Sequence, residues 1–256
     1  MDDQTRGLIE KYVHDNIDDF HAKRLANIQG LTLKAVLENK NPYLFKAKNL
    51  NQPAELIAAI LDARLSSGEE TSFGRFLEGL AVYVAQITAG GQKSAAKGID
   101  IELTRDGIRY LIAVKSGKNW GNDDQHKKLA EHFRTLVRVL RQNQQVGQVM
   151  PVEGICYGKF GKGDKGKQDK GHYIRLIGQS FWYLISGDQN FYVDVIGPLA
   201  HEAEAHAAKF QEEKDATYTR LTHEFTEQFC DAEFKIDWPK LIRYVSETMP
   251  LVKKPL

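Results

Sequence analysis

The segment GIDIELTRDGIRYLIAVKSG spans residues 98–117 and contains two short runs suited to β-strands, separated by a turn. The first run, residues 99–104, alternates apolar and polar side chains, and the second, residues 108–114, is mostly apolar. Between them, Arg-Asp-Gly at 105–107 has the composition that a tight turn favours. The pattern therefore predicts a β-hairpin.

This hairpin places an acid beside a lysine. Asp100 and Glu102 stand two residues apart, so both point to one face of the first strand. Lys115 ends the second strand, 15 residues after Asp100, and strand pairing brings the two residues together. A carboxylate that binds a divalent cation beside an ammonium suits phosphodiester hydrolysis, because the cation activates water and both positive charges stabilise the transition state. A structural salt bridge between Asp100 and Lys115 would show the same spacing, so that alternative stays open.

Helical periodicity precedes the hairpin. Apolar residues recur at helical spacing over residues 4–26, and the Asn-Pro pair within 39–43 predicts a turn. Pro53 suits the first position of a second helix, which Ser-Ser-Gly at 66–68 would end. A third helix is predicted over residues 69–87.

Helices and strands alternate after the hairpin. Asn122 and Gln125, three residues apart, predict the capped start of a helix. Strands are predicted near residues 149–157 and 173–177, and helices follow from residue 181 onward. This order predicts an α/β fold with a central mixed β-sheet flanked by helices.

We expect a single domain over residues 1–256. Its N-terminal helices would occupy residues 1–90, its sheet core 98–178 and its C-terminal helices 179–245. With 42% hydrophobic and 27% charged residues, the composition is that of a soluble globular protein.

The composition also bears on location and redox state. The two cysteines cannot form a disulfide framework or a four-cysteine zinc site, and the polar first residues do not resemble a signal peptide. The apolar run at 80–85 is far too short to span a bilayer. We therefore expect a cytoplasmic protein that does not enter a membrane.

Charge is distributed unevenly along the chain. The total net charge is only +1, yet residues 115–175 hold 13 Lys or Arg against 6 Asp or Glu, a net of +7. Residues 197–234 are acidic, with 3 Lys or Arg against 9 Asp or Glu. Because a partner senses local charge, the basic segment can still bind phosphates. The acidic helices are a candidate region for dimer or scaffold contacts.

Residues 98–103 and 110–117 together resemble the core of the PD-(D/E)XK nuclease superfamily, and more narrowly the PmeII family of type II restriction endonucleases. The supporting stretches are residues 41–45, 76–80, 119–122 and 181–187. The resemblance covers roughly residues 41–243. It implies a PD-(D/E)XK restriction-endonuclease-like core with additional N- and C-terminal helices.

The resemblance also implies a function. Such an enzyme is a Mg²⁺-dependent homodimer that cleaves double-stranded DNA at a short, near-palindromic site and leaves 5′-phosphate ends. Within a restriction-modification system, a cognate DNA methyltransferase is its functional partner. By the same resemblance, Asp100 would bind the metal and Lys115 would stabilise charge during catalysis.

Two positions depart from the superfamily pattern. Ile99 replaces the proline, and Ala113 replaces the acid that should stand two residues before Lys115. Because an acid is missing at Ala113, another carboxylate must be recruited if the protein is a nuclease.

Three carboxylates could replace the missing acid. Glu102 shares the face of Asp100, Glu131 lies on the following helix, and Glu78 lies on a preceding helix. The neighbours of Glu78 on that helix are small, namely Gly74, Ala81 and Ala85. Because small residues let a helix approach closely, we expect Glu78 to be the second acid and Glu102 a further metal ligand. Each could equally be an ordinary solvated glutamate.

Polar and basic residues after Lys115 are candidates for DNA contacts. They are Ser116, Lys118, Asn119, Trp120, Asn122, Gln125, Lys162, Lys165 and Lys167. Amides and cations of this kind bind base edges and phosphates. Trp120 could instead be a packing residue, and the lysine-rich loop at 159–170 could be a phosphate clamp or an ordinary surface loop. A positive edge is also predicted along the next helix, at Lys127, Lys128, Arg134, Arg138 and Arg141.

Other functions fit the same residues. The missing acid at Ala113 suits a non-cleaving DNA-binding module built on a nuclease fold. A repair or junction-resolving nuclease would share the same core, and an α/β enzyme with an unrelated substrate is a further alternative.

Overall fold

The computed structural model describes residues 1–38, 40–142, 147–162 and 168–247. The chain forms two compact units, unit 1 from residues 1–20 and 72–205, and unit 2 from residues 21–71 and 206–256. Three long helices contribute to both units: α1 (Asp3–Gln29), α4 (Pro53–Ala89) and α8 (Ile196–Phe229). The predicted division into helices, sheet core and helices follows chain order, whereas each compact unit combines two separate stretches of chain.

Unit 1 contains a five-stranded mixed sheet in the order β1-β2-β3-β4-β5. The strands are β1 (Gln92–Lys93), β2 (Ile101–Arg105), β3 (Ile108–Gly117), β4 (Gln148–Tyr157) and β5 (Ile174–Ile177). The first three strands pair antiparallel, whereas β3, β4 and β5 pair parallel. The expectation of an α/β fold with a mixed sheet is confirmed.

The predicted hairpin is formed by β2 and β3. Their register runs from Ile101 opposite Ile112 to Arg105 opposite Ile108. The two residues of the turn, Asp106 and Gly107, both have positive φ, 52° and 75°. A two-residue turn with positive φ at both positions matches the twist of the paired strands, which explains why Gly follows Asp here.

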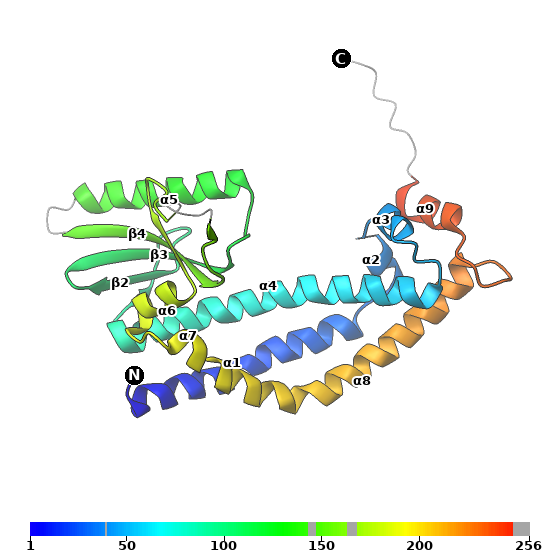
Figure 1. Cartoon of the computed structure of the whole chain (residues 1–256), viewed down its shortest axis with the longest axis horizontal. Helices are drawn as coiled ribbons and strands as arrows, with labels where there is room; N and C mark the ends of the chain where they lie inside the picture. The colour runs from blue at the N-terminus through cyan, green and yellow to red at the C-terminus, as the bar shows by residue number, and fades with distance from the viewer. Residues whose placement is uncertain (39, 143–146, 163–167, 248–256) are drawn as a thin grey trace, which may run out of the picture. The chain divides into compact units, whose positions relative to one another are not determined.

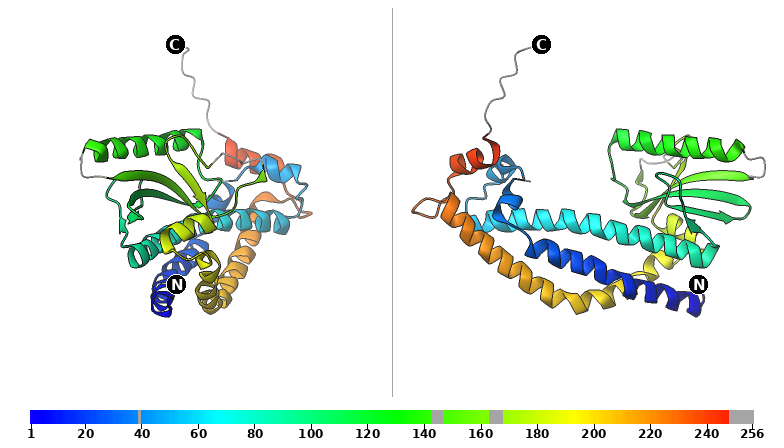
Figure 2. Two further views of the ribbon diagram at one scale, coloured as in Figure 1. Left: turned by 60° about the vertical axis from the view of Figure 1, so that its left-hand side comes forward. Right: turned by 180° about the vertical axis from the view of Figure 1, so that it is seen from behind.

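Helices cover both faces of the sheet in unit 1. Helix α5 (Asp123–Gln142) lies on one face, and α6 (Gln179–Ser186) with the C-terminal part of α4 lies on the other (Figures 1 and 2). Alternation along β3 supplies both layers, because Leu111 joins the cluster beneath α5 and Ile112 joins the cluster beneath α4 and α6. Side chains that alternate in this way bury a central strand on both faces.

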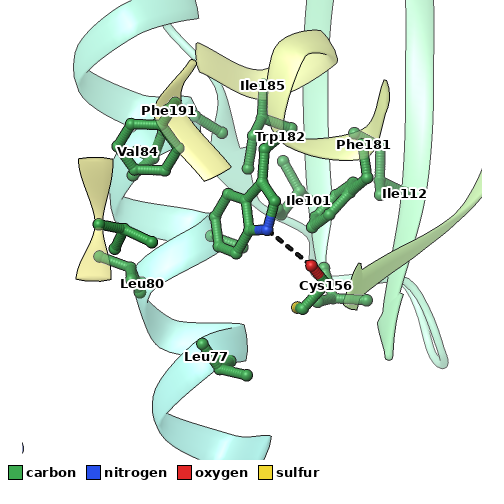
Figure 3. Packing of buried hydrophobic residues seen from close by; sticks show 14 of the residues in the cluster. Leu77, Leu80, Val84, Ile101, Ile112, Cys156, Phe181, Trp182, Ile185 and Phe191 are labelled. Atoms are coloured by element: carbon green, nitrogen blue, oxygen red, sulfur yellow. Dashed lines mark hydrogen bonds between the residues drawn. The ribbon is translucent and has the colours of Figure 1, made fainter. Parts of the chain in front are cut away.

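The cluster beneath α4 and α6 surrounds Trp182 (Figure 3). The Trp182 indole is 3% exposed, and its Nε1 donates a 2.8 Å hydrogen bond to the Cys156 carbonyl oxygen of β4. Leu80 and Val84 of α4 are completely buried in the same cluster. The C-terminal part of α4 is therefore packed firmly on the sheet.

Helix α4 is continuous over 37 residues, so the predicted stop at residues 66–68 is wrong. Within it, the Ser67 hydroxyl donates to the Ala63 carbonyl at 3.0 Å, and the Thr71 hydroxyl donates to the Ser67 carbonyl at 3.0 Å. These hydroxyls bond backward along the helix and do not end it. Buried side chains on both sides, such as Leu65 and Phe76, hold the helix through the Ser-Ser-Gly segment.

The described regular elements of unit 2 are helices, together with an isolated β-bridge between Cys230 and Ile236. Parts of α4 and α8 pack with α2 (Leu33–Leu37), α3 (Pro42–Ala47) and α9 (Trp238–Ser246), and the C-terminal part of α1 packs with α4 and α8. The Asn-Pro pair of the predicted turn begins α3, because Asn41 Oδ1 accepts the Tyr43 N–H at 3.0 Å. Residue 39 of that predicted turn lies outside the described ranges.

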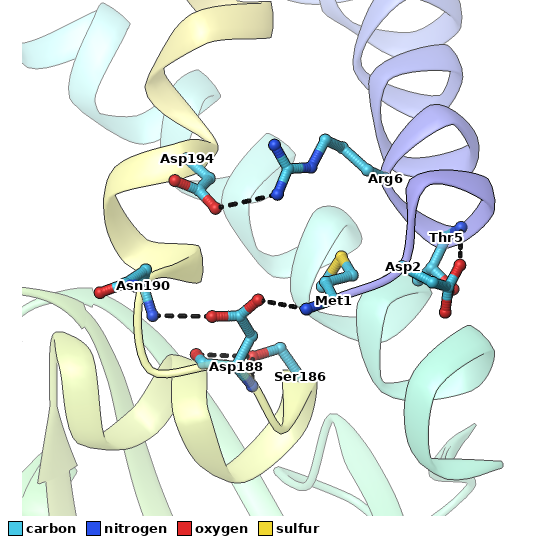
Figure 4. A network of polar contacts seen from close by, with 8 residues as sticks. All are labelled: Met1, Asp2, Thr5, Arg6, Ser186, Asp188, Asn190 and Asp194. Atoms are coloured by element: carbon cyan, nitrogen blue, oxygen red, sulfur yellow. Dashed lines mark hydrogen bonds and ion pairs between the residues drawn. The ribbon is translucent and has the colours of Figure 1, made fainter.

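The first turn of α1 is bonded within unit 1 to the segment around α7 (Phe191–Asp194) (Figure 4). The Met1 amino group lies 2.7 Å from Asp188 Oδ2, and Arg6 lies 3.7 Å from Asp194 Oδ2. The Met1 amino group and the Asn190 N–H hold the pKa of Asp188 below its ordinary value. Within unit 1, these contacts hold the start of α1 against the segment that contains α7.

Candidate active site

Three charged side chains from three elements of unit 1 converge at one end of the hairpin. They are Glu78 of α4, Asp100 just before β2, and Lys115 of β3. Burial raises the pKa of the Glu78 carboxyl, the negative charge of Asp100 raises it further, and Lys115 lowers it. The charges of Asp100 and Lys115 therefore reach the Glu78 carboxyl, whereas the chemical roles of the three groups stay predictions.

Backbone hydrogen bonds orient Asp100. Its N–H donates to the Ile112 carbonyl at 2.8 Å, and its Oδ2 accepts the Val114 N–H at 2.6 Å. Within the described residues, Asp100 forms no ion pair with Lys115, so the structural salt bridge considered above is not present. The carboxylate is instead tied to the neighbouring strand and keeps Oδ1 for other ligands.

Glu78 reaches this end of the sheet because α4 approaches it closely. A Cβ placed on Gly74 would stand 3.4 Å from the Ser116 Cβ, and Ala81 and Ala85 are completely buried against the core. The Glu78 side chain is half-buried and has no hydrogen bond or ion pair with any described residue. It is therefore a partly desolvated carboxylate without a structural partner.

Lys115 lies against an aromatic ring. Its Nζ stands 4.9 Å from the centroid of the Trp120 ring, and the Trp120 Nε1 donates a 2.5 Å hydrogen bond to Glu153 Oε1. Trp120 also meets the His126 ring edge-on, with centroids 4.5 Å apart. These contacts favour the packing alternative for Trp120 over direct DNA contact.

Glu102 has hydrogen-bond partners of its own, and its expected role as a metal ligand stays a prediction that these contacts do not favour. Ser94 Oγ donates to its Oε1 at 2.6 Å, and Arg109 donates to its Oε2 at 2.6 Å. Burial alone would raise the pKa of Glu102, but these hydrogen bonds outweigh it and hold the pKa below the ordinary value. Glu102 pairs with Leu111, four residues before Lys115 and about 13 Å along the strand, so a shared face does not bring it to the same end.

Cys156 lies near the same charges. Its thiol is 5% exposed, and burial, with a smaller contribution from the Glu78 charge, raises its pKa to about 12. A thiol with such a pKa stays protonated and is a poor nucleophile. Cys156 is therefore a packing residue behind the candidate site.

The family of the chain follows from its sequence. A family model described as Type II restriction endonuclease EcoO109I matches residues 7–207. The chain belongs to this EcoO109I family. The match is not to the PmeII family that the motifs resemble, but the enzyme class, type II restriction endonuclease, is the one expected. A search of curated proteins finds no match.

Membership of the EcoO109I family identifies a restriction nuclease and implies that the chain binds DNA. The mixed sheet flanked by helices agrees with a restriction-endonuclease-like fold. None of the described helices is both long enough and apolar enough to cross a membrane.

The two carboxylates of the candidate site suit a hard divalent cation with few protein ligands. Among the described residues, no cluster of three or more His, Cys, Asp and Glu side chains could hold a metal ion. Asp100 and Glu78 are two carboxylates, and Mg²⁺ is often held by one or two carboxylates together with water and substrate phosphate. The pair therefore fits Mg²⁺ better than a metal that requires a full protein cage.

The candidate DNA-contacting residues of the EcoO109I-family chain have different environments. Ser116 is half-buried beside Gly74, whereas Lys118, Asn119 and Lys162 are exposed. Asn122 and Gln125 are exposed and cap α5, as predicted. The Asn122 Oδ1 accepts the Gln125 N–H at 3.1 Å, and the Gln125 Oε1 accepts the Asn122 N–H at 2.8 Å. Lys165 and Lys167 lie outside the described residues.

The sequence does not single out Glu153, which the structure places beside the site. It is completely buried in β4 and is the register partner of Ala113, where the acid is missing. The signal in the sequence that could have indicated Glu153 is an acid within a strongly apolar strand. Its partners, Trp120 and Arg175, are far from it along the chain.

Proposed function

We propose that the chain is a Mg²⁺-dependent type II restriction endonuclease that hydrolyses phosphodiester bonds of double-stranded DNA at a specific sequence and leaves 5′-phosphate ends. The observation that carries this proposal is the convergence of Glu78, Asp100 and Lys115 at one end of the β2–β3 hairpin. Family membership supports the reaction class.

Three residues of the chain would have separate roles in the reaction. Asp100, oriented by the Val114 N–H, and Glu78, which has no hydrogen bond or ion pair with any described residue, would hold Mg²⁺. The bound cation supplies Lewis acidity and an activated water. The Lys115 ammonium would stabilise the negative charge that develops on the phosphate oxygens. Glu78 would thus replace the acid missing at Ala113.

A basic hollow on unit 1 supports contacts with the DNA backbone. It has a volume of about 590 Å³, and its lining includes Arg134, Arg138 and Arg141 of α5 together with Pro151 and His172. The described residues that line it include no carboxylate. Arginines presented together in this way can contact successive phosphates without reading sequence.

The EcoO109I-family chain would act as a homodimer, since a two-fold protein matches a near-palindromic site and each protomer can cut one strand. The acidic surface of α8, within residues 197–234, is the candidate dimer region. A cognate DNA methyltransferase would be the functional partner that protects host DNA.

The decisive experiment is incubation of the purified protein with phage and plasmid DNA in Mg²⁺. We expect discrete fragments, whereas Lys115→Ala should leave the DNA intact and still bind it in Ca²⁺. A matched control is Lys34→Ala, which removes an exposed lysine paired with Glu38 in unit 2 and should cleave normally.

Each other outcome would contradict the proposal in a distinct way. DNA binding without cleavage by the wild-type protein would favour a non-cleaving binding module. Nicking confined to branched DNA would favour a junction-resolving nuclease. Full activity of Lys115→Ala would remove the lysine from the mechanism.

A further inference from the structure

A buried negative charge lies beside the proposed catalytic strand. The Glu153 side chain is completely buried, and a carboxylate in that position is costly unless it is paired and hydrogen-bonded. Arg175 of β5 supplies the pairing: its Nε donates to Oε2 at 2.7 Å, and its Nη2 donates to Oε1 at 3.0 Å. This two-pronged contact fixes the plane of the Glu153 carboxylate.

Glu153 also accepts a hydrogen bond from Trp120. The indole Nε1 donates to Oε1 at 2.5 Å, so both carboxylate oxygens already accept hydrogen bonds. Although Glu153 stands beside Ala113 in the register, its oxygens are committed to Arg175 and Trp120. It is therefore poorly placed to replace the missing acid as a metal ligand.

Trp120 connects the fixed Glu153 carboxylate to Lys115. It lies in the connection between β3 and α5, where a side chain without an anchor could adopt several rotamers. The bond to Glu153 holds the indole so that its ring stands 4.9 Å from the Lys115 Nζ. A cation over an aromatic face at this distance is attracted by the ring quadrupole. The ring is the described contact that restrains the Lys115 ammonium, which has no carboxylate partner among the described residues.

We propose that Glu153 and Trp120 are positioning residues for Lys115. The buried carboxylate of Glu153 fixes the Trp120 indole, and the indole holds the Lys115 ammonium at the end of β3 where the scissile phosphate would lie. This inference rests on the proposed function, because it concerns the lysine assigned to the chemical step. Neither residue would touch the DNA or the metal.

A simpler role for Glu153 is to neutralise Arg175 inside unit 1. The two roles make different demands on Trp120. Neutralisation of Arg175 requires nothing of the indole ring, whereas positioning requires both its N–H and its face. Substitutions at Trp120, which is only half-buried, separate the roles with less risk to folding than substitutions at Glu153.

The first test is spectroscopic and does not depend on cleavage. In protein with ¹³C-labelled lysine, the Lys115 side-chain resonances, assigned by their loss in Lys115→Arg, should be shifted by the Trp120 ring current. The shift should vanish in Trp120→Leu and be reduced but not lost in Trp120→Phe, which keeps an aromatic face but cannot bond to Glu153. It should also persist in Trp182→Phe, a matched control that loses an indole N–H bond to the Cys156 carbonyl in the core.

The second test separates catalysis from binding. Trp120→Leu should lower the single-turnover cleavage rate by about 10- to 100-fold, since a small displacement of a reacting group costs about that much. Trp120→Phe keeps an aromatic face and should recover part of the loss. Affinity for DNA in Ca²⁺ should stay within about twofold of the wild-type value in both variants, because the side chain at position 120 would not contact the DNA.

The outcomes separate this inference from the proposed function. Unshifted Lys115 resonances in the wild type, or equal losses of cleavage rate in Trp120→Leu and Trp182→Phe, would overturn the positioning role. A parallel loss of DNA affinity in Trp120→Leu would overturn it too, in favour of direct DNA contact. A wild-type protein that never cleaves DNA would instead defeat the proposed function, while the ring-current shift still reports whether Trp120 holds Lys115.

Discussion

Asp100 Oδ2 accepts the backbone N–H of Val114 at 2.6 Å, so the carboxylate at the start of β2 is tied to β3 one residue before Lys115. The distance between the acid and the lysine is therefore set by strand pairing and not by their mutual attraction. Because the two charges do not pair with each other, both can act on a further group. Glu78 is a carboxylate whose pKa responds to both of them.

Glu78→Gln should abolish cleavage, because the amide removes one of the two carboxylates proposed to hold Mg²⁺. We expect the cleavage rate in Mg²⁺ to fall by about a hundredfold or more. Glu131→Gln is the matched control, since Glu131 is the exposed acid of α5 that was the other helical candidate. Cleavage assays on both variants decide between them, and a loss confined to Glu131→Gln would reverse the assignment.

Metal binding should depend on pH through Glu78. Its pKa is raised above 4.5 by burial and by Asp100, so the carboxylate loses its negative charge, and with it Mg²⁺ affinity, at a higher pH than an ordinary glutamate would. Lys115 lowers this pKa, so Lys115→Met should move the midpoint to still higher pH. Titration calorimetry with Mn²⁺ or Mg²⁺ across acidic pH measures the midpoint. An unchanged or lower midpoint in Lys115→Met would show that the two groups are not coupled.

Glu102→Gln should affect stability and leave catalysis nearly intact. The variant loses the ion pair with Arg109, which we expect to lower the free energy of unfolding by about 1 kcal/mol. Because the folded state lowers the pKa of Glu102, this stabilisation is present above the unfolded-state pKa and is lost as the pH falls through the folded-state pKa. Urea unfolding of both proteins at neutral and strongly acidic pH should show the difference shrinking in acid. A Glu102→Gln enzyme that is stable but inactive would restore Glu102 as a metal ligand.

Replacing Arg134, Arg138 and Arg141 by alanine should weaken binding to duplex DNA of any sequence. If each arginine contacts one phosphate, the slope of log affinity against log salt should fall by about 0.9 per residue. A control that removes three exposed lysines with carboxylate partners should change the slope little: Lys11, Lys34 and Lys235. Fluorescence anisotropy in Ca²⁺ over a range of salt concentrations measures both slopes. Equal slopes for the two triple variants would exclude the basic hollow as a backbone contact.

Local elements were predictable because their causes are local. The alternation along residues 99–104 and 108–114 and the Asp-Gly turn specify the hairpin, and the reciprocal bonds of Asn122 and Gln125 specify the start of α5. The length of α4 was not predictable in the same way. Its Ser-Ser-Gly segment is a weak helix former, and packing on both sides of it overrides that preference.

In the candidate site, too, some contacts follow from local sequence and others depend on tertiary packing. Asp100 and Lys115 belong to one hairpin, so their proximity follows from the spacing of residues within a single stretch of chain. The choice of Glu78 over Glu102 depends on how closely α4 approaches β3 at Gly74, and the environment of Lys115 depends on Trp120, Glu153 and Arg175, which come from separate elements. A linear pattern records which face a side chain occupies but not which distant segment packs against it, because that packing is settled only when the whole unit buries its core.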